Sequence, residues 1–508
     1  MLRNGLLPRR WDFEALSESP AQVSAFVKPR LRRGQSGNQA NVIMSDKGWR
    51  GVRPIHVMTL EDRVLYRAVV DLLTLSLPDT VTKRMPFEDF KRAPIIERMR
   101  YISKADVAAY YEFVDHAYLA EELISQTGEE PAVDALADLL GRVMGRRIGL
   151  PQVNTASNVL GDTYIDMVRR RLVRRGYAVF TYSDDFRIAS RTLADAREAL
   201  EACAEEVRVL GLVLNERKTY TYGARKYEAS LTSFAKAERS LFAADQGPEG
   251  DQAADPFALG TTSESYDAEE RDTSTLGASP LDRGIDDSEA FDEAALGVTQ
   301  YPDSGKASAA RRAWQIWENE DESEETQAGQ DAVITQSLLG LALPILGAVG
   351  DAAPIESLSL LLRFEPGLAP HVAAYIAAYA RHGLSARGEI RQALNDVVEE
   401  NIFSPWQGMW LAQAAGELPR TRREQTYERW LTKCVSESHH DGLTATAAAS
   451  LGRLGRKKNA DVVAAAVERV SAPWKRLAFW GILGLDSALA DRVADDGIDR
   501  LLIAATLS

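Results

Sequence analysis

Two adjacent carboxylates, Asp184 and Asp185, lie between short apolar segments and are well placed to do chemistry. Val179 and Phe180 precede them and Ile188 follows, so the pattern predicts a strand, a tight turn and a second strand. Burying two like charges side by side is costly unless cations or basic groups neutralise them. A divalent metal ion is the usual partner of clustered Asp side chains. The same pair also occurs as an ordinary solvated hairpin tip, so the motif needs support from other residues.

A third aspartate, Asp106, offers a carboxylate from a second segment. It follows a short apolar strand signal at Tyr101 and Ile102. Phosphoryl transfer by two metal ions needs carboxylates from at least two segments, with the ions about 3.5–4 Å apart. Asp106 and Asp184 could supply them. Taken alone, Asp106 is equally well interpreted as the N-cap of a helix over residues 108–123.

Two amphipathic helices are predicted on either side of the adjacent acids, where they could position the strands. Their apolar residues recur every three or four positions. These residues are Tyr164, Ile165, Val168 and Leu172 in the first helix, and Leu193, Ala196, Leu200, Cys203 and Val207 in the second.

Five segments in this order resemble the finger and palm blocks of reverse transcriptases, especially the bacterial kind found in group II introns, retrons and antiphage defence systems. The segments are Arg53-Pro54-Ile55 with Glu61-Asp62-Arg63-Val64-Leu65, Asp106 with Tyr110 and Tyr111, Leu150-Pro151-Gln152 with Ser157, Tyr182-Ser183-Asp184-Asp185, and the block from Leu210 to Lys218. One such block arises by chance, but five in order over residues 50–220 do not. The resemblance implies an α+β fold of fingers and palm over residues 1–240, with an antiparallel sheet and helices.

The resemblance also implies a metal site. Asp106, Asp184 and Asp185 would ligate two Mg²⁺ ions, for which Mn²⁺ can substitute, because hard oxygen ligands suit these cations. One ion would lower the pKa of the attacking hydroxyl, and the other would neutralise charge on the triphosphate.

Five further residues receive nucleotide-binding roles from the resemblance. Tyr111 takes the position of the ribose gate, a ring that leaves no room for a 2′-hydroxyl and so favours dNTPs over rNTPs. Gln152 would approach the nascent base pair, Arg53 and Arg63 the triphosphate, and Lys218 the departing pyrophosphate. For the four polar residues the alternative is a solvated surface group.

The residue after Leu-Pro-Gln departs from the family pattern. Family members usually have Gly there, which lets the backbone approach the template and adopt unusual dihedral angles. Here the residue is Val153, whose β-branched side chain disfavours positive φ and fills space. We therefore expect little ordinary copying of long RNA, and instead synthesis from a bound short RNA or with little templating.

The net charge of −14 is concentrated in one segment. Residues 245–305 contain sixteen Asp or Glu and two Arg, which gives this stretch alone a charge of −14. Its composition predicts a flexible linker or insertion over residues 241–305, which separates domains or else mimics nucleic acid and shields a basic channel. Residues 1–53 hold ten Lys or Arg against four acids, a local excess that would meet phosphate.

Length and composition set further limits. A chain of 508 residues is too long for one core, so two or three domains are expected. Cys203 and Cys434 lie in apolar, helix-like contexts and are predicted to be buried, unpaired thiols. The sequence has no signal peptide and no run of eighteen apolar residues, so we expect a cytoplasmic protein without a membrane partner.

Residues 306–508 are predicted to form one helix after another. This succession favours stacked helical hairpins of the HEAT type, although no strict period emerges. The expected helices are 309–317, 334–349, 355–362, 371–382, 389–399, 405–415, 423–434, 444–454, 460–470 and 474–485.

Fingers and palm joined to a helical repeat domain resemble the abortive-infection and defence-associated reverse transcriptases. That resemblance implies antiphage defence, RNA-directed or template-independent DNA synthesis from dNTPs, contact with RNA or single-stranded DNA, and a homo-oligomer. In some members a hydroxyl of the protein primes synthesis. Tyr375, Tyr379 and Tyr427 are candidate acceptors, with buried ring packing as the alternative for each.

Two other functions stay open. One is a retron-like or intron-like enzyme that copies a dedicated non-coding RNA. The other is a non-catalytic scaffold that only binds nucleic acid. The intact Asp106, Asp184 and Asp185 argue against the scaffold, because clustered acids without metal would only reduce stability.

Overall fold

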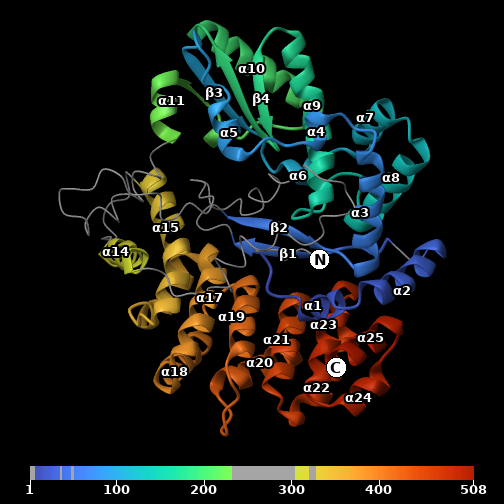
Figure 1. Ribbon diagram of the computed structural model, residues 1–508, viewed down its shortest axis with the longest axis vertical. Helices are drawn as coiled ribbons and strands as arrows, with labels where there is room; N and C mark the ends of the chain where they lie inside the picture. The colour runs from blue at the N-terminus through green and yellow to red at the C-terminus, as the bar shows by residue number, and fades with distance from the viewer. Residues whose placement is uncertain (1–5, 35–36, 47–50, 232–303, 320–327, 508) are drawn as a thin grey trace.

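The computed structural model has two parts, a part with antiparallel sheets and helices followed by a helical region (Figure 1). The acidic stretch expected at 241–305 lies almost entirely outside the described residues. The structure describes residues 6–34, 37–46, 51–231, 304–319 and 328–507.

A four-stranded antiparallel sheet in the order β4-β5-β3-β6 is the framework of the first part. Its strands are β3 (Tyr101–Asp106), β4 (Ala178–Tyr182), β5 (Asp185–Ser190) and β6 (Tyr220–Gly223). β4 and β5 form the hairpin predicted around the adjacent acids. Strand alternation places Phe186 and Ile188 in the hydrophobic core and turns Asp185 and Arg187 to the opposite face.

The two predicted amphipathic helices are both present and pack on the sheet. They are α9 (Thr155–Arg174) and α10 (Leu193–Val209). Asn154 caps α9 through the Ala156 N–H, and Thr192 and Asp195 form a capping box at the start of α10. These caps fix where each helix leaves the neighbouring strand or loop.

The interpretation of Asp106 as a helix N-cap is wrong. Asp106 is the last residue of β3, where it pairs with β5. The following segment forms the short α6 (Tyr110–Phe113) and then α7 (His116–Thr127), which Asp115 caps through two backbone N–H groups. The apolar run therefore divides into two helices, and the cap lies nine residues after Asp106.

The other elements of the first part surround the sheet. The hairpin of β1 (Asn41–Asp46) and β2 (Val52–Val57) precedes α3 (Leu60–Thr74), which packs on α8 (Glu130–Met144) and α9. The remaining short elements are α4 (Asp79–Thr82), α5 (Phe87–Arg92), η1 (Glu216–Lys218) and α11 (Ala224–Leu231).

The helical region forms two layers, and a helix of one layer alternates with a helix of the other along the chain. The layer that faces the first part comprises α15 (Ala328–Val349), α17 (Ala369–Tyr379), α19 (Pro405–Glu417), α21 (Asp441–Leu454) and α23 (Ala472–Leu483). The outer layer comprises α16 (Leu358–Phe364), α18 (Leu384–Glu400), α20 (Thr426–Glu437), α22 (Ala460–Arg469) and α24 (Ser487–Val493). The other helices here are α14 (Ser304–Asn319), α25 (Gly497–Leu507), η3 (Ile355–Ser357), η4 (Pro366–Leu368), η5 (Ala380–His382) and η6 (Lys457–Asn459).

Each of the ten helices expected here has a counterpart in the structure. Stacked helical pairs are the arrangement that the sequence predicts. The HEAT-type assignment itself stays a prediction.

The N-terminal segment joins the two parts. Helices α1 (Trp11–Ser17) and α2 (Pro20–Arg32) contact α25, and α1 also contacts α23. The Trp11 ring stacks on that of Trp480 with 5.5 Å between centroids. Ile43 of β1 and Ile55 of β2 belong to the same hydrophobic cluster as the helical core. In Figure 1 the β1–β2 hairpin lies between the four-stranded sheet and the helical stack.

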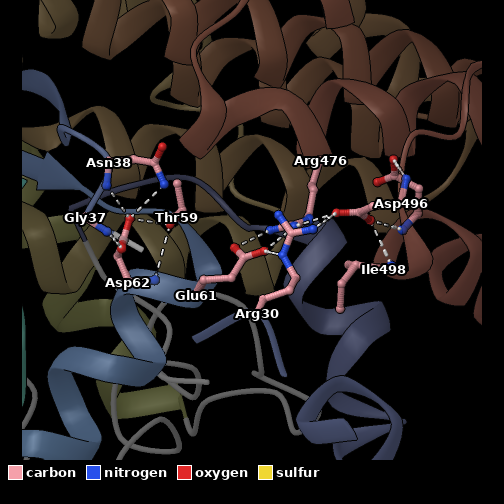
Figure 2. Close-up of polar contacts among 10 residues, drawn as sticks. Arg30, Gly37, Asn38, Thr59, Glu61, Asp62, Arg476, Asp496 and Ile498 are labelled. Carbon is pink, nitrogen blue, oxygen red and sulfur yellow. Dashed lines mark hydrogen bonds and ion pairs between the residues drawn. The ribbon is translucent and has the colours of Figure 1, made fainter. Parts of the chain in front are cut away.

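An ion-pair network crosses the same contact and is drawn in Figure 2. Arg476 of α23 donates to both carboxylate oxygens of Glu61, at 2.8 and 3.1 Å, in the first turn of α3. Asp496 lies 3.3 Å from Arg476, and Arg30 of α2 lies 3.4 Å from Glu61. Three segments far apart in sequence therefore meet at one carboxylate.

The two cysteines are free and buried, as predicted. Within the described ranges, no helix combines the length and the apolar character needed to cross a membrane.

Candidate active site

The structure brings the three aspartates together at one end of the four-stranded sheet. Asp106 ends β3 and Asp185 begins β5, and the strand register places them directly opposite each other. Asp184 lies in the two-residue turn between β4 and β5, and its carbonyl accepts the Val107 N–H at 3.2 Å. Asp106 and Asp185 are each 6% exposed. Two nearly buried like charges therefore lie side by side.

Each of the facing carboxylates has its own cation. Lys218 Nζ lies 3.1 Å from Asp106 Oδ1, and Asn215 Nδ2 donates to Asp106 Oδ2 at 3.1 Å. Arg187 Nη1 donates to Asp185 Oδ1 at 3.1 Å. Burial raises the pKa of Asp106, Lys218 opposes that shift, and the charge of Asp185 reinforces it.

The aspartates fit a divalent cation by their donor chemistry, because carboxylate oxygens are the ligands that Mg²⁺ and Mn²⁺ prefer. Across the ranges that the structure describes, no three His, Cys, Asp or Glu side chains gather closely enough to hold a metal ion. Lys218 and Arg187 pair with Asp106 and Asp185. Metal binding would require these cations to share or release the carboxylates.

Tyr111, the predicted ribose gate, lies beside the turn that carries Asp184. Its hydroxyl donates to Asn158 Oδ1 at 2.9 Å and lies 3.2 Å from Ser183 Oγ. Its carbonyl accepts the Leu150 N–H at 2.7 Å, which ties the Leu-Pro-Gln segment to the same place. Tyr111 therefore lies next to the turn that carries Asp184.

Gln152 contacts a polar cluster that reaches the β1–β2 hairpin. Its Nε2 donates to Glu112 Oε1 at 3.3 Å. Glu112 also pairs with Arg146, at 2.5 Å, and lies 3.9 Å from His56 Nδ1 on β2. Glu112 of α6 therefore holds Gln152 near the β1–β2 hairpin.

Val153 adopts a positive φ, the backbone conformation that its β-branched side chain disfavours. Its φ is +62°, in the left-handed region. Its partly buried side chain packs against the hydrophobic cluster shared by the N-terminal segment and the helical region. The chain keeps a glycine-like backbone here and adds an apolar contact.

Arg53 and Arg63 lie on the hairpin and on α3. Arg53 is opposite Ser45 in the β1–β2 pair. The guanidinium of Arg63 lies 5.3 Å from the centroid of the Phe13 ring in α1. Burial, reinforced by Arg10, lowers the pKa of Arg63 to about 10. Arg63 thus contacts the N-terminal helix α1, and Arg53 lies in the β1–β2 hairpin. The role of both arginines in binding triphosphate stays a prediction.

The three candidate priming tyrosines have buried rings in the helical region. Tyr375 donates to the Asp351 carbonyl at 2.7 Å, and Tyr379 donates to Glu389 at 2.6 Å. Tyr427 is 0% exposed. Each would have to leave this packing to act as an acceptor, and their priming role stays a prediction.

Residues 45–231 match the family model described as reverse transcriptase (RNA-dependent DNA polymerase). This part of the chain is a reverse transcriptase domain, and the helical region follows it. The family acts in general as an RNA-directed DNA polymerase, binds nucleic acid and dNTPs, and uses divalent metal ions. A comparison with curated proteins gives no match.

Sequence reasoning missed four polar residues near the aspartates: Arg187 and Asn215, which contact Asp185 and Asp106, and the ion pair of Arg84 with Asp162, whose carboxylate accepts the Ser183 N–H. Arg187 lies two positions after Asp185 on one strand, so strand alternation could have placed both on the same face. Asn215 lies in the block that ends at Lys218 and could have been found there. Arg84 and Asp162 carry no sequence signal, because they are far apart along the chain.

Proposed function

We propose that this protein is a reverse transcriptase-like DNA polymerase of antiphage defence, which joins dNTPs by two-metal nucleotidyl transfer, with RNA direction or without a conventional template. The observation that carries the proposal is the direct opposition of Asp106 and Asp185, with Asp184 in the adjoining turn, inside a reverse transcriptase domain.

The site residues would have different roles in the proposed reaction. Asp106, Asp184 and Asp185 would hold Mg²⁺, which when bound activates the attacking hydroxyl and neutralises triphosphate charge. Tyr111, whose hydroxyl lies 3.2 Å from Ser183 Oγ, would limit the space at C2′ of an incoming nucleotide. Lys218, which pairs with Asp106, would turn its flexible side chain to the departing pyrophosphate.

The defence role is supported by the order of the parts, a reverse transcriptase domain followed by a two-layered helical stack. Val153 adds a side chain where the family usually has Gly, and we infer from this added side chain synthesis with little templating. We further propose a cytoplasmic homo-oligomer whose HEAT-like region organises the subunits and which can prime synthesis from Tyr375, Tyr379 or Tyr427.

The test is incorporation of each labelled dNTP by the purified protein with Mg²⁺, with and without added RNA. We expect incorporation by the natural chain and none by Asp184→Ala/Asp185→Ala. The matched control is Asp134→Ala/Asp138→Ala, which removes two exposed acids from α8 and should leave incorporation unchanged.

Digestion of the product with protease and with nuclease distinguishes the priming routes. A product whose mobility changes on protease treatment supports protein priming. Phage plating on cells that express each variant tests the defence role, and protection by Asp184→Ala/Asp185→Ala equal to the natural chain would contradict it. Incorporation that persists in this variant would overturn the assigned site.

A further inference from the structure

The turn that carries Asp184 is held in a strained conformation at Ser183. Ser183 has φ +50°, which residues with a Cβ rarely adopt, and it is only 4% exposed. Such a conformation costs free energy and persists only when the surroundings hold it. The residues that hold Ser183 therefore determine where the two acids after it lie.

Two side chains hold Ser183 from different directions. The Asp162 carboxylate, on α9, accepts the Ser183 backbone N–H. The Tyr111 hydroxyl lies 3.2 Å from Ser183 Oγ. Asn158, one turn before Asp162 on α9, accepts the proton of that same hydroxyl at 2.9 Å. One face of α9 thus supports both the turn and the predicted ribose gate.

Arg84 in turn holds Asp162. Its Nε and Nη2 atoms donate to the two carboxylate oxygens at 2.8 Å each. Only 7% of the Arg84 side chain and 16% of the Asp162 side chain are exposed. The guanidinium also lies 4.8 Å from the centroid of the Tyr182 ring, the residue before Ser183. A bidentate pair of this kind fixes orientation as well as charge.

Burial raises the pKa of Asp162, and the charge and hydrogen bonds of Arg84 oppose that shift. An ionised carboxylate accepts a backbone N–H more strongly than a protonated one does. Arg84 therefore has two effects on the turn: it orients Asp162 and it favours the charged form of the acceptor.

We propose that Arg84 and Asp162 are positioning residues for nucleotidyl transfer, which fix the Asp184-Asp185 turn and, through Ser183 and Tyr111, tighten selection against ribonucleotides. This inference rests on the proposed function. Its physical basis is that in-line transfer is sensitive to small displacements, with a misplacement of about 1 Å costing on the order of a hundredfold in rate.

The first test compares Asp162→Asn and Arg84→Lys with the natural chain. We expect kcat to fall by about 10- to 100-fold with KM for dNTP changed by less than about threefold, because the acids move while the triphosphate contacts stay. The preference for dNTPs over rNTPs should fall in the same variants. Glu206→Gln is the matched control, since Glu206 pairs with Arg171 and Arg175 at the other end of α9. Its kcat and sugar preference should not change.

The second test separates positioning from stability. The exchanged pair Arg84→Asp/Asp162→Arg keeps two opposite charges, but an arginine cannot accept the Ser183 N–H. We expect its melting temperature to recover relative to the single variants while kcat stays low. Recovery of kcat together with the melting temperature would overturn the proposal.

Hydrogen exchange gives a readout that does not need activity. In Asp162→Asn, the amide of Ser183, followed in a peptide spanning residues 178–190, should exchange at least about tenfold faster, because its acceptor is weakened. Unchanged exchange would overturn the positioning role. A natural chain that incorporates no dNTP would contradict the proposed function instead, and the exchange result would still decide whether Asp162 holds the turn.

Discussion

At the scale of single residues, the positive φ of Val153 predicts that Gly gives a more stable protein than Ala at this position, the reverse of their usual order. A left-handed conformation costs a residue with a Cβ roughly 1–2 kcal/mol, and Gly avoids this cost. Val153→Gly gains that relief but loses the apolar contact with the shared core cluster, whereas Val153→Ala loses the contact and keeps the strain. We expect Val153→Gly to be more stable than Val153→Ala by about 1 kcal/mol, as measured by urea unfolding.

The same pair of variants tests what Val153 does to templating. If the side chain obstructs the template, Val153→Gly should copy added RNA several-fold better than the natural chain, and untemplated incorporation should change less. Val153→Ala, which keeps the Cβ, should lie between them. Equal use of RNA by all three proteins would contradict the obstruction.

The sequence predicted residues of the site whose chemistry and spacing form a motif, and the structure brings Asp106, Asp184, Asp185, Tyr111 and Lys218 together. The sequence did not indicate that Arg84 and Asp162 lie beside these residues. Their pairing depends on how the segment before α5 folds onto α9, and no local pattern encodes that contact. Residues that position a site through contacts with other side chains are determined by tertiary packing, which cannot be inferred from a single sequence.

At the scale of elements, helices α21 and α23 approach so closely that glycines are needed between them. A Cβ added to Gly481 would lie 2.4 Å from the Ala448 carbonyl oxygen. Gly481→Ala should therefore push the helices apart and reduce the free energy of unfolding by more than about 2 kcal/mol, the scale of overpacking in a core. Thermal and urea unfolding measure the loss.

Gly388 in α18 is the matched control for Gly481. A Cβ added there meets nothing within 4 Å. Because Ala has the higher helix propensity, Gly388→Ala should raise stability by about 0.5–1 kcal/mol. Equal effects of the two substitutions would contradict the close approach of α21 and α23.

Most elements could be predicted because each has a local cause. Successive segments separated by Gly, Pro or polar breaks indicated the helices of the C-terminal region, and the apolar residues that flank the acids indicated β4 and β5. The layering of those helices, and the docking of α1 and α2 onto α23 and α25, depend on contacts between distant segments. The succession of helices favoured their stacking in pairs, but the docking of α1 and α2 had no signal in the sequence.

At the scale of the whole molecule, the Glu61 network connects the reverse transcriptase domain to the helical region (Figure 2). Burial would raise the pKa of Glu61, but the hydrogen bonds and charge of Arg476, with a contribution from Arg30, outweigh it and the pKa is lowered. A carboxylate with a lowered pKa contributes stability above its ordinary pKa and loses it as the pH falls through the folded value. The contact between the two parts should therefore weaken in acid.

Glu61→Gln tests this connection directly. Only 7% of the Glu61 side chain and 14% of the Arg476 side chain are exposed. Glu61→Gln leaves Arg476 with Asp496 but removes the bidentate partner of Arg476 and the charge beside Arg30, so at neutral pH we expect a loss of about 2 kcal/mol in the free energy of unfolding. The matched control is Glu437→Gln, from an exposed pair, which should change stability by less than about 0.5 kcal/mol. Unfolding followed between pH 7 and pH 3 should show the difference between Glu61→Gln and the natural chain narrowing below about 4.5, the ordinary pKa of Glu. A difference that is constant over this range would mean that the Glu61 carboxylate does not hold the two parts together by its charge.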